Sequence, residues 1–331
     1  MNKSEQTLLI QHQTIAELLD MTTAIEAVEE VFRIYGSGNV QMPPKSYLQF
    51  AAGDLRCMPT YVPELGFACV KNVSVHPHNT SLPTVQASIT LFDPNSGFPL
   101  AMMDGTLITA FRTAASAAVA TRLLARKDAS LLGFLGVGRQ AYAQVEALLK
   151  VLPACKSIIV YDVKKAKAEK TQKDWTEKYS LKIEIADTIE SLLANTDVLT
   201  TTTPTSEPLI LMQHIHQGLH INAIGADAKG KQEIATEVMT GATIIIDNWE
   251  QASHSGEINV PLASGILTKN DIQGDIGQLV TGQIPGRTSV EEITVFDSTG
   301  LAIQDLACAV AIYQSLLKRP EILKNLQRIS F

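Results

Sequence analysis

The sequence has few cysteines, no basic tail or stripe, and no long uninterrupted apolar segment. Its four cysteines, Cys57, Cys69, Cys155 and Cys308, lack the close paired spacing of a disulfide framework or a zinc knuckle, which predicts reduced thiols. With a net charge of −7, the chain has no Lys/Arg stripe that would neutralise phosphates. We therefore expect no nucleic-acid partner.

The sequence also lacks the apolar and charged patterns expected of a membrane segment or a targeting signal. The apolar region of residues 107–135 is interrupted by charged side chains between Arg112 and Asp128, and Met1 to Leu9 has no cationic stretch followed by an apolar core. We expect a cytoplasmic protein without a membrane segment. The 331 residues, 45% of them apolar and 18% charged, suffice for two hydrophobic cores.

The first third of the chain predicts an α+β domain. Helical spacing of apolar residues runs from Thr14 to Tyr35, and the first fifty residues are expected to be mostly helical. Short β-like segments then follow between glycine and proline turns, which predicts a mainly antiparallel sheet. These segments are residues 45–50, 55–61, 68–75, 85–92 and 100–104.

After an Ala-rich helix at residues 110–124, strand and helix signals alternate, which predicts a doubly wound parallel sheet of the Rossmann type. Its strands are expected at residues 131–135, 157–161, 198–202, 221–224, 243–247 and 295–297. A helix from Ile303 to Leu317 and a helical, charged tail complete the chain. The predicted domains are residues 1–118 with 302–331, for substrate binding and dimerisation, and residues 119–301, for the dinucleotide.

The second domain opens with a glycine turn between a strand and a helix. Gly136 permits the tight turn, Gly138 lets the backbone approach phosphates, and Ala141 brings helix and strand together. The next strand ends in Asp162, whose carboxylate can accept the ribose hydroxyls of NAD and would repel the 2′-phosphate of NADP. NAD is therefore favoured, with NADP as the alternative because three basic residues, Arg139, Lys164 and Lys165, could pair with that phosphate.

Substrate chemistry beside a nicotinamide needs cations and an acid. Lys71 stands in an apolar segment where burial would lower its pKa, although a lysine pointing into water is the simpler alternative. Lys45, Arg56 and Arg112 are further cations. Asp227 follows a strand at the edge where open α/β sheets bind ligands, as a general acid/base or merely a turn cap. The histidines lack nearby carboxylates or cysteines, so no metal site is expected.

Several motifs in order resemble the ornithine cyclodeaminase and μ-crystallin family, and within it the archaeal-type alanine dehydrogenases. They are Arg56-Cys57-Met58-Pro59, residues 66–77 with Lys71, Leu82-Pro83-Thr84, Phe111-Arg112-Thr113-Ala114, residues 136–141, residues 222–227 and residues 296–302. The resemblance implies a homodimer joined through the N-terminal sheets and a substrate site in a cleft beside a Rossmann domain. It also implies Lys71 and Asp227 as the catalytic pair, with Lys45, Arg56 and Arg112 near the substrate carboxylate or the nicotinamide end of the cofactor.

The cofactor residues expected from the motifs and the resemblance together are Thr84, Arg112, Thr113, Gly136, Gly138, Arg139, Gln140, Asp162, Thr202, Thr203, Ala223, Ile224, Gly225, Lys231 and Ser298. Two positions depart from the family. Lys45 stands where arginine is common, which weakens a bidentate carboxylate clamp. Arg56 stands near an acidic position of the cyclodeaminases and would repel the distal ammonium of ornithine.

These features predict NAD-dependent oxidative deamination of a small L-amino acid, most simply alanine to pyruvate and ammonia. The alternatives are ornithine cyclisation to proline, reduction of cyclic ketimines, and a μ-crystallin-like binding protein that retains the cofactor fold. The pair of Lys71 and Asp227 favours a catalyst over a binding protein.

Overall fold

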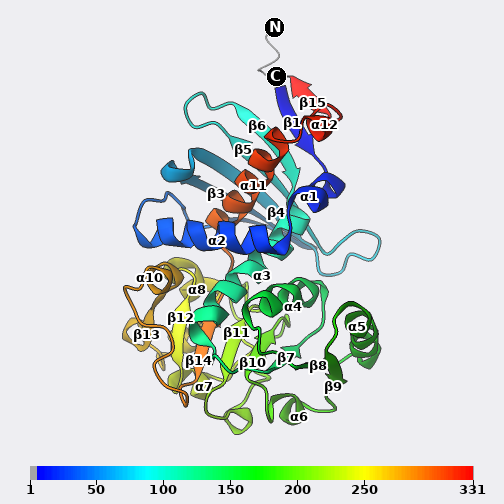
Figure 1. The fold of residues 1–331 in the computed structure, drawn as a ribbon. Helices are drawn as coiled ribbons and strands as arrows, with labels where there is room; N and C mark the ends of the chain where they lie inside the picture. The colour runs from blue at the N-terminus through cyan, green and yellow to red at the C-terminus, as the bar shows by residue number, and fades with distance from the viewer. Residues whose placement is uncertain (1–5, 331) are drawn as a thin grey trace. The chain divides into compact units, whose positions relative to one another are not determined.

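A computed structural model describes residues 6–330 of the chain (Figure 1). Its contacts divide the chain into one unit of Met1–Ala115 with Leu301–Phe331 and a second of Ser116–Gly300. The predicted division fell at 118/119 and 301/302. Two segments distant in sequence therefore build the first unit, whereas the second is a continuous insertion.

A seven-stranded sheet with the order β15-β1-β6-β5-β4-β3-β2 forms the first unit. Its strands are β1 (Gln6–Ile10), β2 (Ser46–Phe50), β3 (Gly53–Val62), β4 (Phe67–Val75), β5 (Val85–Phe92), β6 (Pro99–Asp104) and β15 (Arg328–Ser330). The predicted antiparallel meander from β2 to β6 is confirmed. β1 is the exception, because it pairs parallel to β6.

Helices α1 (His12–Leu18), α2 (Met21–Gly36), α11 (Ala302–Leu317) and α12 (Pro320–Leu323) belong to this unit. Asp20 is the N-cap of α2, and its side chain accepts the backbone N–H of Thr23. The helix buries one apolar face. α11 is apolar almost all round and packs against α2 and strands β3, β4 and β5. Side chains of β3, β4 and β5 therefore pack against side chains of α11.

Two short strands at the ends of this unit were not predicted. The first fifty residues contain the expected helices but also β1, and the tail contains α12 but ends in strand β15. β15 pairs antiparallel with β1, with Thr7 opposite Ile329. β1 pairs with β6 on one side and β15 on the other, and β15 pairs with β1, so both strands depend on distant segments and their own sequences carry little signal.

The second unit contains an eight-stranded parallel sheet with the order β13-β12-β14-β11-β10-β7-β8-β9. The strands are β7 (Leu131–Leu135), β8 (Ser157–Tyr161), β9 (Lys182–Ile185), β10 (Val198–Thr201), β11 (His220–Ala223), β12 (Thr243–Ile246), β13 (Ile272–Asp275) and β14 (Thr294–Asp297). The doubly wound fold is confirmed, although β9 and β13 were not predicted. The reversal of strand order beside β7 is the topological switch point of such sheets.

The helices between these strands are α4 (Arg139–Val151), α5 (Lys165–Lys178), α6 (Ile189–Leu193), α7 (Thr236–Thr240), α8 (Trp249–Ser255), α9 (Asn259–Ala263) and α10 (Ile276–Val280), with short 3-10 turns elsewhere. Two apolar clusters fill the unit, one around Phe134 and Trp175 and another around Ile221 and Ile244. The sheet is thus buried, and its carboxyl edge is held in a fixed register.

Helix α3 (Gly105–Leu124) continues from the last residues of the first unit's N-terminal segment into the second unit. By length and composition alone α3 could cross a membrane, but 67% of its most apolar stretch of 18 residues is buried inside the protein. Alanines dominate this buried surface, including Ala114, Ala117 and Ala118. Such burial is typical of a core helix.

Candidate functional site

The glycine turn after β7 has the geometry that a pyrophosphate needs. Gly136 adopts a left-handed conformation with φ +84°, and a Cβ there would lie 2.9 Å from Cγ2 of Thr203. Gly138 is the N-cap of α4, provides no capping side chain, and has open space where a Cβ would point. The first amides of a 13-residue helix are therefore accessible to an anion.

Asp162 lies just beyond β8 and is tied to the same turn. Its Oδ2 accepts the backbone N–H of Val137 over 3.1 Å, and Oδ1 accepts that of Lys164 over 2.9 Å. These two bonds fix the carboxylate beside the glycine turn while leaving lone pairs for other donors. The arrangement fits a carboxylate that receives ribose hydroxyls.

The carboxyl ends of β10, β11 and β14 bring the other expected cofactor residues to this edge. Those residues are Thr202, Thr203, Ala223, Ile224, Gly225 and Ser298. Thr202 Oγ1 donates to the carbonyl oxygen of Gly136 over 2.8 Å, which links the β10 loop to the glycine turn. Ser298 Oγ is buried and has no hydrogen-bond partner within residues 6–330. An unpartnered buried hydroxyl at this edge suits a ligand contact.

The remaining expected residues of the second unit lie near the start of α4 and after β11. Arg139 is exposed and Gln140 is half-buried at the start of α4. Lys231 Nζ lies 2.5 Å from Oδ1 of Asp227, so the predicted catalytic acid and a predicted cofactor contact form an ion pair. Both side chains remain partly exposed, at 27% and 35%. Asp227 thus has a cationic neighbour that sequence reasoning did not anticipate.

Among the described residues of the first unit, Lys71 is the most deeply buried cation. It lies on β4, where its side chain is 1% exposed, and its Nζ donates to Oδ1 of Asp305 on α11 over 2.9 Å. Burial, together with the nearby charge of Arg112, lowers the pKa of Lys71 from its ordinary 10.5 to about 7, although the Asp305 carboxylate opposes this shift. An amine with such a pKa exchanges protons near neutral pH.

Arg112, on α3, meets the same carboxylate. Its Nε lies 3.1 Å from Asp305 Oδ1, and its Nη1 donates to Gln304 Oε1 over 2.9 Å. Asp305 Oδ2 is buried without a hydrogen-bond partner in the described part of the chain. One carboxylate oxygen therefore serves two cations.

Arg56 lies on β3, and Lys45 directly precedes the neighbouring strand β2. Arg56 is 6% exposed and pairs with Asp54 through Nε–Oδ1 at 2.8 Å and Nη2–Oδ2 at 3.1 Å. Its guanidinium also lies over the Tyr47 ring. Lys45 is half-buried, and its charge contributes to the lowered pKa of Lys71. The sequence predicted that the positive charge of Arg56 would repel the side-chain ammonium of ornithine. The ion pair between Arg56 and Asp54 offsets that charge.

The first unit thus brings Lys71, Arg112 and Lys45 into one electrostatic group, with Arg56 on the neighbouring strand. Thr84 is exposed before β5, and Thr113 is buried on α3. Sequence reasoning missed Asp305 and Gln304. The available signal was a pair of polar residues within the otherwise apolar residues 301–312 at the start of α11.

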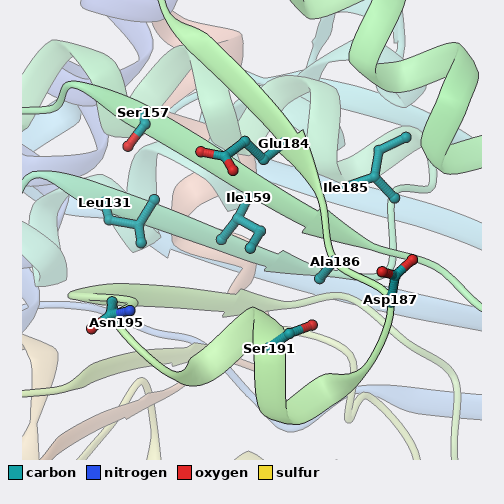
Figure 2. A pocket seen from close by; sticks show the side chains of 9 residues that line it. All are labelled: Leu131, Ser157, Ile159, Glu184, Ile185, Ala186, Asp187, Ser191 and Asn195. Carbon is teal, nitrogen blue, oxygen red and sulfur yellow. The ribbon is translucent and has the colours of Figure 1, made fainter.

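A separate cavity of about 380 Å³ lies on the second unit between strands β7–β9 and helix α6 (Figure 2). It is lined by Leu131, Ser157, Ile159, Glu184, Ile185, Ala186, Asp187, Ser191 and Asn195. None of the expected cofactor or catalytic residues belongs to this set. Within residues 6–330, no group of three His, Cys, Asp or Glu side chains could hold a metal ion.

Comparisons with known proteins identify the family of the chain. The profile of the ornithine cyclodeaminase/mu-crystallin family matches residues 5–319. Alanine dehydrogenase of Archaeoglobus fulgidus is 44% identical, covering 95% of this chain and 96% of the relative. Ketimine reductase mu-crystallin of Mus musculus is 32% identical, over 88% of this chain and 90% of the relative.

Two solved structures have the same fold throughout. An archaeal alanine dehydrogenase dimer with bound NAD superposes with a TM-score of 0.93 at 42% identity, covering 98% of this chain and 99% of that one. The Delta(1)-pyrroline-2-carboxylate reductase of Thermococcus litoralis, in complex with NADH and L-proline, gives a TM-score of 0.92 at 32% identity, covering 95% and 98%. The chain therefore belongs to the ornithine cyclodeaminase/mu-crystallin family and is an oxidoreductase of the kind that this family contains.

Proposed function

We propose that the protein is an NAD-dependent amino-acid dehydrogenase that interconverts L-alanine with pyruvate and ammonia. The observation that carries this proposal is Lys71, a buried amine with a pKa of about 7. Its amine pairs with the Asp305 carboxylate, and two further cations, Arg112 and Lys45, lie nearby. Such a group can exchange protons with an amino acid, while neighbouring cations attract its carboxylate. The 44% identity to an alanine dehydrogenase supports the choice of substrate.

NAD is the cofactor. Gly136, the open N-terminus of α4 and Asp162 fit its pyrophosphate and ribose, and the two solved relatives contain NAD and NADH. We assign Thr202, Thr203, Gly225 and Ser298 to the same site because they follow neighbouring strands at its edge. When bound, NAD accepts a hydride from the substrate Cα.

The protein's own groups would bind the substrate and move its protons. Arg112, Arg56 and Lys45 attract the carboxylate, with Arg56 moderated by Asp54. Neutral Lys71 accepts a proton from the substrate ammonium, so that the amine lone pair can assist hydride departure. Asp227 accepts a proton from the water that adds to the imine carbon. L-alanine, NAD⁺ and water thus give pyruvate, ammonium, NADH and one proton.

We also propose that the protein is a homodimer. β2 is an edge strand of the first sheet, and two of its apolar side chains are exposed, Leu48 at 61% and Phe50 at 49%. An edge with unpaired backbone groups and exposed apolar side chains is suited to association. The archaeal alanine dehydrogenase relative is a dimer. Light scattering after gel filtration tests this assignment.

Turnover tests the proposed reaction directly. NADH absorbance is followed with pyruvate plus ammonium, and alanine is quantified as the product. Proline and ammonia formed from L-ornithine, without net NADH, would contradict the proposal and favour a cyclodeaminase.

Reduction of a cyclic ketimine is the second candidate, because a pyrroline-carboxylate reductase shares the fold with a TM-score of 0.92. A much higher kcat/KM for Delta(1)-pyrroline-2-carboxylate than for pyruvate with ammonium would favour it. Tight NADH binding without turnover of any of these substrates would favour a binding protein.

A further inference from the structure

Glu233 is a buried carboxylate that receives four hydrogen bonds, from the end of strand β10 and from the loops after β10 and β11. It is fully buried in the second unit, between β11 and α7. Its Oε1 accepts the backbone N–H and the hydroxyl of Thr203, each over 2.6 Å. Its Oε2 accepts the Thr201 hydroxyl over 2.6 Å and the Gly225 N–H over 2.8 Å. Each oxygen therefore holds one backbone amide and one hydroxyl.

The four donors lie at the edge assigned to the cofactor. Thr201 is the last residue of β10 and Thr203 follows it, whereas Gly225 follows the end of β11. β10 and β11 are adjacent parallel strands, with Thr201 opposite Ala223. One side chain thus connects the two loops that carry Thr202, Thr203 and Gly225.

The space around Glu233 leaves little freedom for these loops. A Cβ added at Gly225 would lie 2.2 Å from the carbonyl oxygen of Thr203 and 2.5 Å from Glu233 Oε2. Both contacts are far inside van der Waals distance, so the loops approach each other as closely as glycine allows. Glu233 therefore fixes their separation as well as their hydrogen bonding.

A second buried acid holds the backbone of Glu233 itself. Glu257 Oε1 accepts the N–H groups of Glu233 and Ile234 over 2.8 and 2.6 Å. Burial raises the pKa of Glu257 well above its ordinary value, and the charge of Glu233 raises it further. Burial also raises the pKa of Glu233. A protonated Glu257 can keep this anchor without placing two unpaired charges together.

We propose that Glu233 is a positioning residue of the dinucleotide site, which sets the spacing of the β10 and β11 loops and thereby the affinity for NADH. It acts through Thr203 and Gly225 and does not itself touch the cofactor. The inference rests on the assignment of these loops to the NAD site in the proposed function.

Glu233→Gln tests the proposal, with the NADH dissociation constant measured by nicotinamide fluorescence and Tm measured in parallel. Each carboxylate oxygen faces a backbone N–H, so either orientation of the amide points its NH₂ group at one of them. We expect the dissociation constant to rise about tenfold or more. At saturating NADH, kcat should stay within about threefold of wild type, because the chemical groups are unchanged.

Asp197→Asn is the matched control. Asp197 is also buried, and its Oδ2 accepts two backbone amides, of Ser130 and Leu131, but at the amino ends of β7 and β10. We expect it to lower Tm while changing the NADH dissociation constant less than about twofold. Equal Tm losses in both variants, with wild-type NADH affinity in Glu233→Gln, would overturn the proposal.

A second variant decides the case in which Glu233→Gln does not fold. Thr201→Val removes one donor to Glu233 and keeps the side-chain shape, and we expect it to weaken NADH binding about threefold or more. Unchanged affinity in a folded Thr201→Val protein would then overturn the proposal. The binding readout needs no amino-acid substrate. Absence of alanine turnover would therefore contradict the proposed function while a tenfold loss of NADH affinity still supported the role of Glu233.

Discussion

Lys71 Nζ donates to Asp305 Oδ1 over 2.9 Å, although the two residues are 234 positions apart in the sequence. β4 supplies the amine and α11 the carboxylate, and Arg112 shares the same oxygen. The Asp305 carboxylate stabilises the charged form of the fully buried Lys71, but burial still lowers the pKa of Lys71 to about 7. This pairing explains how the first unit can hold a titratable amine at neutral pH.

Replacing Lys71 by methionine is expected to lower kcat by about 10²–10⁴-fold, because the variant loses a proton-transfer group but keeps most of the side-chain volume. Steady-state kinetics with pyruvate, ammonium and NADH give the effect. NADH affinity should change little, since Lys71 is not among the assigned cofactor residues. Lys178→Met is the control, because Lys178 is exposed and pairs with Glu146 on the surface. Wild-type kcat in Lys71→Met would remove Lys71 from the mechanism.

The pH dependence of alanine oxidation should follow the neutral form of Lys71. Its pKa is lowered to about 7, so kcat/KM for alanine should rise with pH through about 7. Asp305 opposes that lowering, so Asp305→Asn should move the rising limb to lower pH. The measurement is kcat/KM from pH 5.5 to 9 for both proteins. A flat wild-type profile, or a shift toward higher pH in the variant, would contradict this role.

Local features of the site could be read from the sequence. Gly136, Gly138 and Asp162 lie within one strand–helix–strand unit, where spacing alone determines their placement. Strands β2 to β6 were likewise recognisable because turn residues separate them. These elements depend on neighbouring residues, and their sequence signals survive without knowledge of the rest of the chain.

Other features depend on residues that meet only in the folded chain. The partner of Lys71 lies on α11, and β15 exists because it pairs with β1. Glu233 resembles an ordinary loop carboxylate until its four donors converge on it. Short strands and buried polar contacts of this kind are set by tertiary context, which overrides local propensity.

Buried Asp297 should make the folded state less stable as pH rises. Burial, together with the charge of Asp247, raises its pKa from 3.8 to about 8. Between these values the folded state keeps a proton that the unfolded chain has lost, so the free energy of unfolding falls from about pH 4 to about pH 8. Denaturant unfolding at pH 5 and pH 8 measures this slope.

Asp297→Asn is the matched variant for that measurement. Oδ2 of Asp297 accepts the Ile258 N–H, and Oδ1 is buried without a partner in residues 6–330, so an amide can keep the acceptor and place its NH₂ at the other oxygen. We expect a smaller difference in unfolding free energy between the two pH values than in wild type. The same slope in both proteins would assign the pH dependence to other groups.

Asp162 should determine the preference for NADH over NADPH. Its carboxylate is fixed by the backbone amides of Val137 and Lys164, and its negative charge opposes a 2′-phosphate. Asp162→Ser should weaken NADH binding about tenfold and narrow the preference over NADPH, because the basic Arg139 and Lys164 remain. Fluorescence titrations with both coenzymes measure the ratio. Asp187→Ser is the control, since this acid follows β9 and lines the separate cavity. The assignment of the ribose site to Asp162 would be contradicted if Asp187→Ser changed the ratio of NADH to NADPH affinity and Asp162→Ser did not. The ribose site would then have to lie nearer β9.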